Sequence, residues 1–238
     1  MAYRKINVDT VYQKVLAIAN KEQRGYVTPQ EFNLFARQAQ QEIFDNYFHD
    51  LKTAQLKPKN STDTSDEINL LNEKISIHRN VATVSDSSIN SQYAVPPNAY
   101  IVSKVTFNNS NGQDVLITEL DSNEFNYANL NPLTAPQASR PIYVRVSGGE
   151  IGIAPIGFTE DIKIYYIERP TDPDWGYVVV NGKALYNSNT SIDFDLHDSE
   201  ENNLVMRILT LAGIAMKDQL LTGTVSQDMA NTEAKKNN

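Results

Sequence analysis

The chain has 238 residues, of which 40% are hydrophobic, and its 21 Lys and Arg against 29 Asp and Glu give a formal net charge of −8. This length allows one or two domains with a sizeable core. The acidic balance argues against binding of phosphate backbones as the main task, since nucleic-acid-binding domains are usually basic. The lack of cysteine excludes disulfides, thiolate catalysis and cysteine-ligated metal centres.

A membrane-bound protein is not indicated either. The N-terminal residues lead into no apolar signal-peptide segment. The densest apolar stretch, residues 204–216, contains Arg207 and falls short of the ~18 apolar residues needed to span a bilayer. We therefore expect a soluble protein with no membrane partner.

Two amphipathic helices are predicted at the start of the chain. Apolar residues recur at intervals of three and four over residues 8–19 and again over residues 32–51, the spacing of a helix with one buried face. Between these runs, Thr28 can cap a first turn, Pro29 suits the first helical position, and Glu31 can reach back to the Thr28 amide. These features predict a helical hairpin.

A polar loop and a third helix are expected next. The second helix should end near residue 53, and the polar residues 55–65 should form an exposed loop. Residues 66–77 predict a helix that Ser65 caps.

From about residue 80 the apolar pattern changes to a period of two, which predicts β-structure. The expected strands are residues 100–107, 115–118, 142–146, 150–154 and 161–167, with a short helix that Asp121 caps and that runs to about Leu130. Because no helix of 10–15 residues separates the strands, we expect an antiparallel sheet or a small barrel.

The C-terminal part predicts a further hairpin and a last helix. Residues 177–195 should form a short hairpin around Asn181 and Gly182, and a helix should begin near Ser199 and stop at residues 222–223. The expected class is α+β. Its parts are a helical domain of residues 1–78 and 197–223, an inserted antiparallel β domain of residues 79–196, and a tail of residues 224–238.

Residues 20–31 align with a twelve-residue EF-hand calcium loop, with Gly25 at position six and Glu31 at position twelve. However, the neutral Asn20 occupies position one, and the cation Arg24 occupies position five, where a carboxylate should bind calcium. We therefore predict a plain turn between helices that binds no metal.

Carboxylates gather near the start of the last helix, at Asp193, Asp195, Asp198, Glu200 and Glu201. A glycosidase pair or a metal site is conceivable there, but a solvated strand end and an acidic helix N-terminus explain the same residues. His197 could act as an oriented base beside Asp195, although capping of the helix start is the favoured role. The sequence predicts no active site and no cofactor.

Three parts of the chain carry a resemblance to a known family. They are residues 11–32 (VYQKVLAIANKEQRGYVTPQEF), residues 165–176 (YYIERPTDPDWG), and residues 193–200 (DFDLHDSE), which run into residues 211–218 (LAGIAMKD). Together they resemble tailed-phage virion proteins of crAss-like and related marine phages, the head-to-tail connector, adaptor or ring proteins. Residues 78–140 show no matching motif.

The resemblance implies a non-enzymatic structural subunit of a ring, usually of twelve copies, stacked below the portal. The localisation it implies is the virion, after synthesis in the host cytoplasm. The partners it implies are further copies of the chain, the portal and neighbouring ring proteins, while DNA passes through the channel without specific binding. Podovirus tail adaptors, which are built similarly, carry a β domain on a helical bundle.

Aromatic and Arg side chains on loops are typical of subunit interfaces. We expect the interface to include Tyr166, Arg169, Trp175, Tyr177, Val225 and Met229. Stacking of a base by Trp175 with Tyr165 and Tyr166 is a less favoured use of these rings. Two other functions stay open: a receptor- or glycan-binding tail module, and a virion-associated hydrolase that uses the carboxylates of residues 193–201.

The tail holds two of these interface residues. Val225 and Met229 are four residues apart, so a partner could order one or two helical turns around them. We expect residues 224–238 to be disordered in the monomer and to fold when docked on a neighbouring subunit or on the portal.

Overall fold

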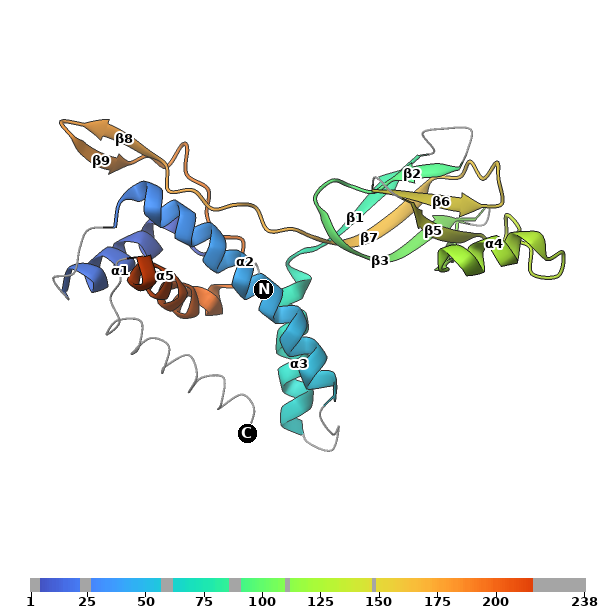
Figure 1. Ribbon diagram of the computed structural model, residues 1–238, viewed down its shortest axis with the longest axis horizontal. Helices are drawn as coiled ribbons and strands as arrows, with labels where there is room; N and C mark the ends of the chain where they lie inside the picture. The colour runs from blue at the N-terminus through green and yellow to red at the C-terminus, as the bar shows by residue number, and fades with distance from the viewer. Residues whose placement is uncertain are drawn as a thin grey trace. The chain divides into compact units, whose positions relative to one another are not determined.

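The computed structural model describes residues 5–21, 27–56, 62–85, 91–109, 112–146 and 149–215. It has an α+β fold, and the chain divides into two compact units (Figure 1). The first unit joins the described residues before His78 to those from Pro170 onward, and the second unit is His78–Arg169. The expected fold class, helices with an inserted sheet, is thus confirmed.

The first unit is helical and carries one small sheet. Its elements are the helices α1 (Val8–Lys21), α2 (Pro29–Leu56), α3 (Thr62–Ser76) and α5 (Glu201–Ala215), the 3-10 turn η1 (Asp198–Glu200), and the strands β8 (Tyr177–Val180) and β9 (Lys183–Tyr186). Helix α2 packs against α3 and α5, and α1 packs against α5. Phe32, Phe44 and Leu204 are fully buried in the core of this unit.

Side-chain caps begin two of these helices. At the start of α2, the Thr28 amide donates to Glu31 Oε2 (3.0 Å) and the Glu31 amide donates to Thr28 Oγ1 (3.3 Å), which confirms the capping box. The Thr28 hydroxyl also donates to Glu31 Oε2 (2.8 Å), and the hydrogen bonds from the Thr28 amide and hydroxyl to this carboxylate lower the pKa of Glu31. At the start of α1, the Val8 amide donates to Asp193 Oδ1 (2.9 Å), so a residue from late in the chain caps the first helix.

Two predicted helix ends need correction. Helix α3 begins at Thr62, so Ser65 lies inside the helix and is not its cap. The apolar spacing could not locate the first turn, because residues 62–67 contain no apolar side chain. Helix α2 extends to Leu56, three residues past its expected end.

The boundary between the units also differs from the expected one, because residues 170–196 belong to the first unit and not to the β unit. Long-range hydrogen bonds hold this segment to the helices. Gln40 on α2 donates to the Thr171 carbonyl (2.8 Å) and accepts from the Asp195 amide (2.9 Å). In addition, Phe194 forms a β-bridge with Ile6.

The second unit is a curled seven-stranded mixed sheet in the order β1-β7-β3-β4-β5-β6-β2. Its elements are β1 (Arg79–Val84), β2 (Gln92–Ala94), β3 (Ala99–Asn108), β4 (Asp114–Glu119), α4 (Ser122–Leu130), β5 (Ile142–Val146), β6 (Glu150–Ala154) and β7 (Ile162–Glu168). Strands β4 and β5 pair in parallel, which corrects the fully antiparallel expectation. The nine-residue α4 and the turn after it supply the crossover that this parallel pair requires.

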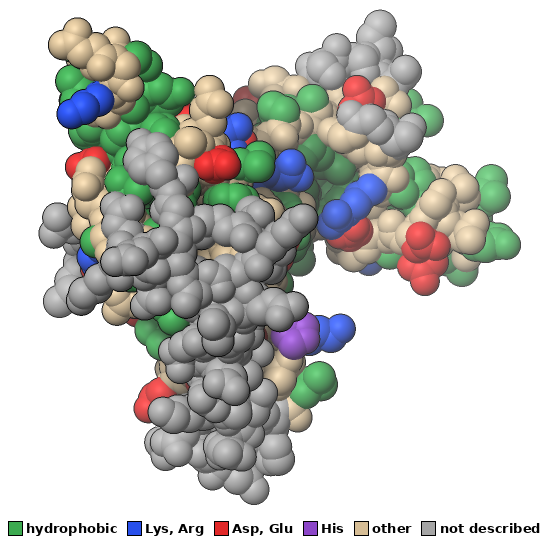
Figure 2. All heavy atoms as spheres, turned by 60° about the vertical axis from the view of Figure 1, so that its left-hand side comes forward, with side chains coloured by type: hydrophobic (Ala, Val, Ile, Leu, Met, Phe, Trp, Pro, Cys, Tyr) green, Lys and Arg blue, Asp and Glu red, His purple; other side chains and the backbone are tan. Residues whose placement is uncertain are grey.

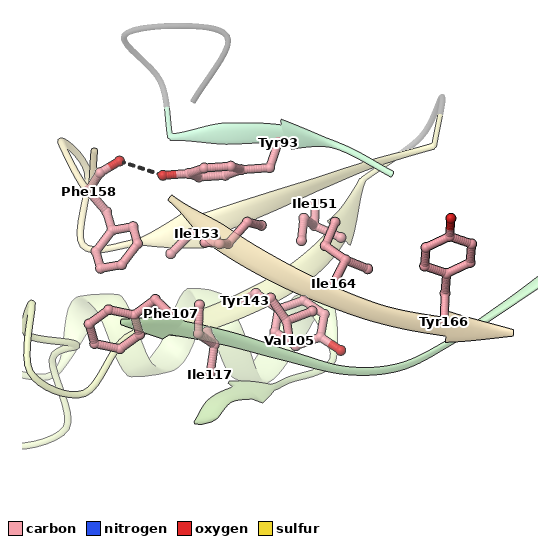
Figure 3. Close-up of a cluster of buried hydrophobic side chains, with 11 residues drawn as sticks. Tyr93, Val105, Phe107, Ile117, Tyr143, Ile151, Ile153, Phe158, Ile164 and Tyr166 are labelled. Carbon is pink, nitrogen blue, oxygen red and sulfur yellow. Dashed lines mark hydrogen bonds between the residues drawn. The ribbon is translucent and has the colours of Figure 1, made fainter. Parts of the chain in front are cut away.

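One hydrophobic cluster fills the inside of this sheet (Figure 3). The rings of Phe107 and Phe158 meet edge to face with centroids 5.2 Å apart. The buried Tyr93 hydroxyl donates to the Phe158 carbonyl (3.1 Å) and to the Glu160 carbonyl (2.9 Å), so its polar group is satisfied. The side chains of the second unit thus form a core of their own.

Candidate functional site

The most distinctive surface of the first unit is the hairpin formed by β8 and β9 (Figure 1). Three consecutive valines lead into its turn at Asn181 and Gly182, which have φ angles of 52° and 75°. Positive φ at both central turn positions defines the type I′ turn that Asn-Gly sequences favour. The hairpin predicted around these two residues is therefore confirmed.

A buried tryptophan anchors the base of the hairpin. Trp175 is only 3% exposed, and its ring contacts Tyr12 of α1, with centroids 4.4 Å apart. The centroid of the same ring also lies 5.8 Å from those of the Tyr177 ring on β8 and the Tyr186 ring on β9. Both strands of the hairpin are thereby fixed to the helical core.

Hydrogen bonds complete this anchor. The Trp175 indole N–H donates to Asp9 Oδ1 (2.9 Å), and its amide donates to Asn33 Oδ1 (2.8 Å). Asn33 in turn donates to Asp174 Oδ1 (2.7 Å), which holds the loop before Trp175 on α2. The polar atoms that burial of Trp175 takes from water are thus satisfied.

Gly176 makes the close approach at the base possible. A Cβ at this position would lie 2.8 Å from the Thr190 carbonyl carbon and 3.0 Å from the Ser191 nitrogen. The Gly176 amide also donates to Ser191 Oγ (3.0 Å), and its carbonyl accepts from the Asn187 amide (2.9 Å). The segments that enter and leave the hairpin therefore pack backbone against backbone.

Beyond this base, the hairpin exposes apolar side chains. In an antiparallel pair, directly opposed residues point to the same side. The register places Val178 opposite Leu185 and Val180 opposite Lys183, and we call these four residues the outer face. Tyr177 and Tyr186 lie on the other side, toward Trp175.

Every residue of the outer face except Lys183 is a large hydrophobic residue, and each of the three is about half exposed. Figure 2 shows hydrophobic side chains gathered along this hairpin, at the upper left. An isolated two-stranded hairpin is at best marginally stable in water, and contiguous apolar surface of this kind marks interaction sites. The arrangement is suited to burial against a partner.

The predicted interface residues are distributed differently from the expectation. The structure corrects the assignment for Tyr166 and Trp175, because both side chains are buried within this chain. Tyr166 lies in the core of the sheet, whereas Trp175 packs among helices of the first unit and not in a sheet core. Tyr165 and Tyr166 belong to the second unit, whereas Trp175 belongs to the first.

Of the other predicted interface residues, Tyr177 is partly exposed on β8, next to the outer face. Arg169 is exposed at the end of β7, and its guanidinium lies 6.0 Å from the centroid of the Tyr100 ring. Val225 and Met229 lie outside the described residues, as do the tail and Arg24 and Gly25 of the EF-hand-like loop.

Sequence reasoning missed the apolar outer face. Val178, Val180 and Leu185 were visible as hydrophobic residues beside an Asn-Gly turn. That pattern predicts a hairpin, but it does not distinguish a buried strand from an exposed one.

The clustered carboxylates are engaged in separate interactions. Asp195 pairs with Lys5 (3.2 Å) and Glu201 pairs with Lys14 (2.6 Å). Glu200 is buried and pairs with Lys74 on α3 (2.5 Å). These ion pairs connect α1, α3 and the residue Lys5 before α1 to the residues around α5. Their role is structural.

The role of His197 as a cap is confirmed. His197 is the N-cap of η1, and its ring nitrogen Nδ1 accepts from the Ser199 amide (3.2 Å). This hydrogen bond satisfies one of the free amides at the helix start.

A second polar group lies at the entrance to α4 in the second unit. A cavity of about 300 Å³ is lined there by Glu119, Leu120, Asp121, Ser122, Val144 and Arg145. Glu119 binds the Arg145 guanidinium through both carboxylate oxygens (2.6 and 3.2 Å) and accepts from the Tyr143 hydroxyl (2.7 Å). Arg145 lowers the pKa of Glu119, and burial together with the Glu119 carboxylate raises the pKa of Tyr143 to about 12.

This group is a structural clamp between β4 and β5. Its carboxylate and its guanidinium neutralise each other, and the neutral Tyr143 hydroxyl donates to the same carboxylate. The residues bridge the parallel strand pair, which makes only two direct register contacts.

Within the described ranges, no three His, Asp or Glu side chains are placed to hold a metal ion. Among the helices described, none is long and apolar enough to cross a bilayer. No protein-family model matches this chain, and no curated protein matches it significantly.

Proposed function

We propose that this chain is a structural subunit of a homo-oligomeric ring in the head-to-tail connector of a tailed-phage virion, and that the β8–β9 hairpin is the part that binds a neighbouring subunit. The observation that carries the proposal is the apolar outer face, which projects from a base held by Trp175. A rigid base limits the entropy that the hairpin loses on binding.

The resemblance to connector proteins supports the same reading. Residues 165–176 and 193–200, which carry part of that resemblance, lie on either side of the hairpin. They include Trp175, which anchors the hairpin, and Phe194 and Asp193, which attach the following segment to the start of α1. Part of the resemblance thus falls on residues that hold the base of the hairpin in place.

The charge of the chain fits a channel for DNA. Each copy carries a formal charge of −8, and like charge would keep a duplex from adhering to the ring as it passes. Binding to a DNA duplex at ~150 mM salt should accordingly be weak or absent, because affinity depends on neutralisation of phosphates. Sub-micromolar affinity in an electrophoretic assay at that salt would contradict this.

Native mass spectrometry of the full chain tests the proposal. We expect a closed ring of about twelve copies, and we expect Val178→Ser with Val180→Ser and Leu185→Ser to shift the protein to monomers. Ile156→Ser is the matched control, since Ile156 is also highly exposed but lies in the second unit. A wild-type monomer at all concentrations, or a ring that the triple variant leaves intact, would refute the proposal. A stable trimer would instead favour a receptor-binding tail module.

A further inference from the structure

Helix α4 of the second unit exposes an apolar stripe that faces away from its own sheet. None of the nine residues of α4 is buried. Phe125 and Ala128 are partly buried, and the helix packs against β5. Because successive helical residues are rotated by about 100°, Tyr127 and Leu130 lie on roughly the opposite side from Phe125 and Ala128.

The stripe consists of Glu124, Tyr127 and Leu130, spaced three residues apart on α4, together with Leu133 in the turn after the helix, and we call these residues the α4 stripe. Tyr127 is 74% exposed, Leu130 79% and Leu133 90%. The turn after α4 fixes Leu133, since the Leu133 amide donates to Asn131 Oδ1 (3.0 Å) and the Thr134 amide donates to the Asn131 carbonyl (3.1 Å). The apolar side chains are therefore presented by an ordered segment.

The α4 stripe and the outer face of the hairpin are complementary in charge. Lys183 is the only charged residue of residues 176–192, and it stands at the tip of the hairpin. Glu124 is the only charged residue of residues 122–139, and it stands in the first turn of α4. Each surface is thus an apolar strip with one charge at one end, and the two charges are opposite.

The two surfaces are also similar in length. The outer face spans two residue steps of each strand, about 7 Å at roughly 3.3 Å per residue. The helical part of the α4 stripe, from Glu124 to Leu130, spans six residue steps, about 9 Å at 1.5 Å per residue. Lys183 of one surface can therefore lie beside Glu124 of the other. In that arrangement, the apolar side chains of the outer face (Val178, Val180 and Leu185) lie along Tyr127 and Leu130.

We propose that the outer face of one copy packs on the α4 stripe of the next copy, with Lys183 paired to Glu124. This inference rests on the proposed function, because it assigns the partner of the hairpin. The two surfaces differ, so the contact is head-to-tail, and repeated contacts of this kind close into a ring when their rotation permits.

The lack of cysteine in the chain allows a direct test. One full-length batch carries Val180→Cys, and a second batch, with a tag that changes its mass, carries Tyr127→Cys. The two are mixed, assembled and mildly oxidised. We expect a disulfide-linked heterodimer as the main product on a non-reducing gel, at least five times more abundant than with Ile156→Cys in place of Tyr127→Cys.

A charge reversal provides an independent readout. Lys183→Glu should raise the concentration needed for half-assembly several-fold, and adding Glu124→Lys to the same chain should restore it. A Glu150→Lys change, made at the partly exposed first residue of β6 and outside the α4 stripe, should not restore it.

The outcomes separate this inference from the proposed function. Rings that depend on the hairpin but give no preferential Val180–Tyr127 cross-link would overturn the inference and leave the proposed function standing. A chain that carries both Val180→Cys and Tyr127→Cys serves as a further control. If the disulfide forms only within that chain and not between the two single-cysteine proteins, the contact is internal to one copy and the inference is overturned. If no ring forms at all, the proposed function and the inference are both refuted.

Discussion

The base and the outer face of the hairpin are neighbours in sequence, yet they have opposite surroundings. Trp175 and Gly176 are buried, hydrogen-bonded and packed on the helices of the first unit. Two and four residues after Gly176, Val178 and Val180 are about half exposed although their side chains are apolar. Apolar character alone therefore does not determine burial within the chain, and the base should govern folding whereas the outer face should govern association.

Removal of the anchor should have the largest effect on stability. Trp175→Ala deletes a buried ring that contacts Tyr12, Tyr177 and Tyr186, and truncation of a buried aromatic residue costs about 3–5 kcal/mol. Urea denaturation followed by circular dichroism should show this loss. Trp175→Phe keeps most of the volume and should lose clearly less. Equal stability of Trp175→Ala and wild type would show that the base is no anchor.

A smaller loss is expected when a methyl group is added at the base. In Gly176→Ala, the new Cβ would lie 2.8 Å from the Thr190 carbonyl carbon, so the backbone must shift. Overpacking of this kind costs about 1–3 kcal/mol. Gly157→Ala is not a suitable control, because Gly157 has a positive φ. Gly152→Ala is suitable, because the nearest atom to its new Cβ would be a methyl carbon of the Val146 side chain at 3.3 Å. Thermal denaturation should rank Gly176→Ala below Gly152→Ala.

Loss of the clamp formed by Glu119, Arg145 and Tyr143 should lower the free energy of unfolding modestly, by an amount that depends on pH. The pKa of Glu119 is lower in the folded than in the unfolded protein. Its contribution to the free energy of unfolding is therefore present above its ordinary pKa and is lost as pH falls through the lowered value. The pKa of Tyr143 is raised to about 12. Its contribution to the free energy of unfolding is therefore complete below pH ~10 and is lost as pH rises toward 12. Because solvent screens the exposed Glu119–Arg145 pair, Glu119→Gln should cost less than about 1 kcal/mol at pH 7.

Urea titrations of wild type and Glu119→Gln at pH 3, 7 and 9 check this. The difference in the free energy of unfolding between the two proteins should be largest at pH 7 and 9 and smallest at pH 3. A difference that grows on acidification would contradict the assigned role of Glu119.

The smallest effect on stability is expected at the outer face. Val178→Ser and Val180→Ser alter side chains that are about half exposed in the single chain. Such surface changes usually alter the free energy of unfolding by no more than ~0.5 kcal/mol. Urea denaturation at concentrations below assembly should show this. A loss as large as that of Trp175→Ala would mean that the chain itself covers these valines.

Local signals in the sequence were sufficient for several elements. The Thr28–Glu31 capping box, the cap role of His197 and the Asn181–Gly182 turn depend on neighbouring residues, and the structure confirms each. Contacts between distant residues were not predictable in this way. Gln40 attaches to Thr171 and Asp195 across more than a hundred residues, and no local pattern shows that these bonds place residues 170–196 with the helices.

The site was only partly predictable for the same reason. The sequence located the hairpin, and it marked Trp175 and Tyr177 as important aromatic residues. It could not show that Trp175 points inward to Asp9 while the outer face stays exposed, because a run of three valines suits a buried and an exposed strand equally. The parallel β4–β5 pair was missed because the crossover helix is only nine residues long.

Hydrogen–deuterium exchange of the hairpin tests the central claim most directly. Peptides that cover Trp175 and Gly176 should be protected in both dilute monomer and assembled protein, since their amides are bonded within the chain. Peptides that cover Tyr177–Val180 and Lys183–Tyr186 should exchange quickly in the monomer and at least ten times more slowly after assembly. If these strands exchange equally fast in both states, no neighbouring subunit covers the outer face and the account is wrong.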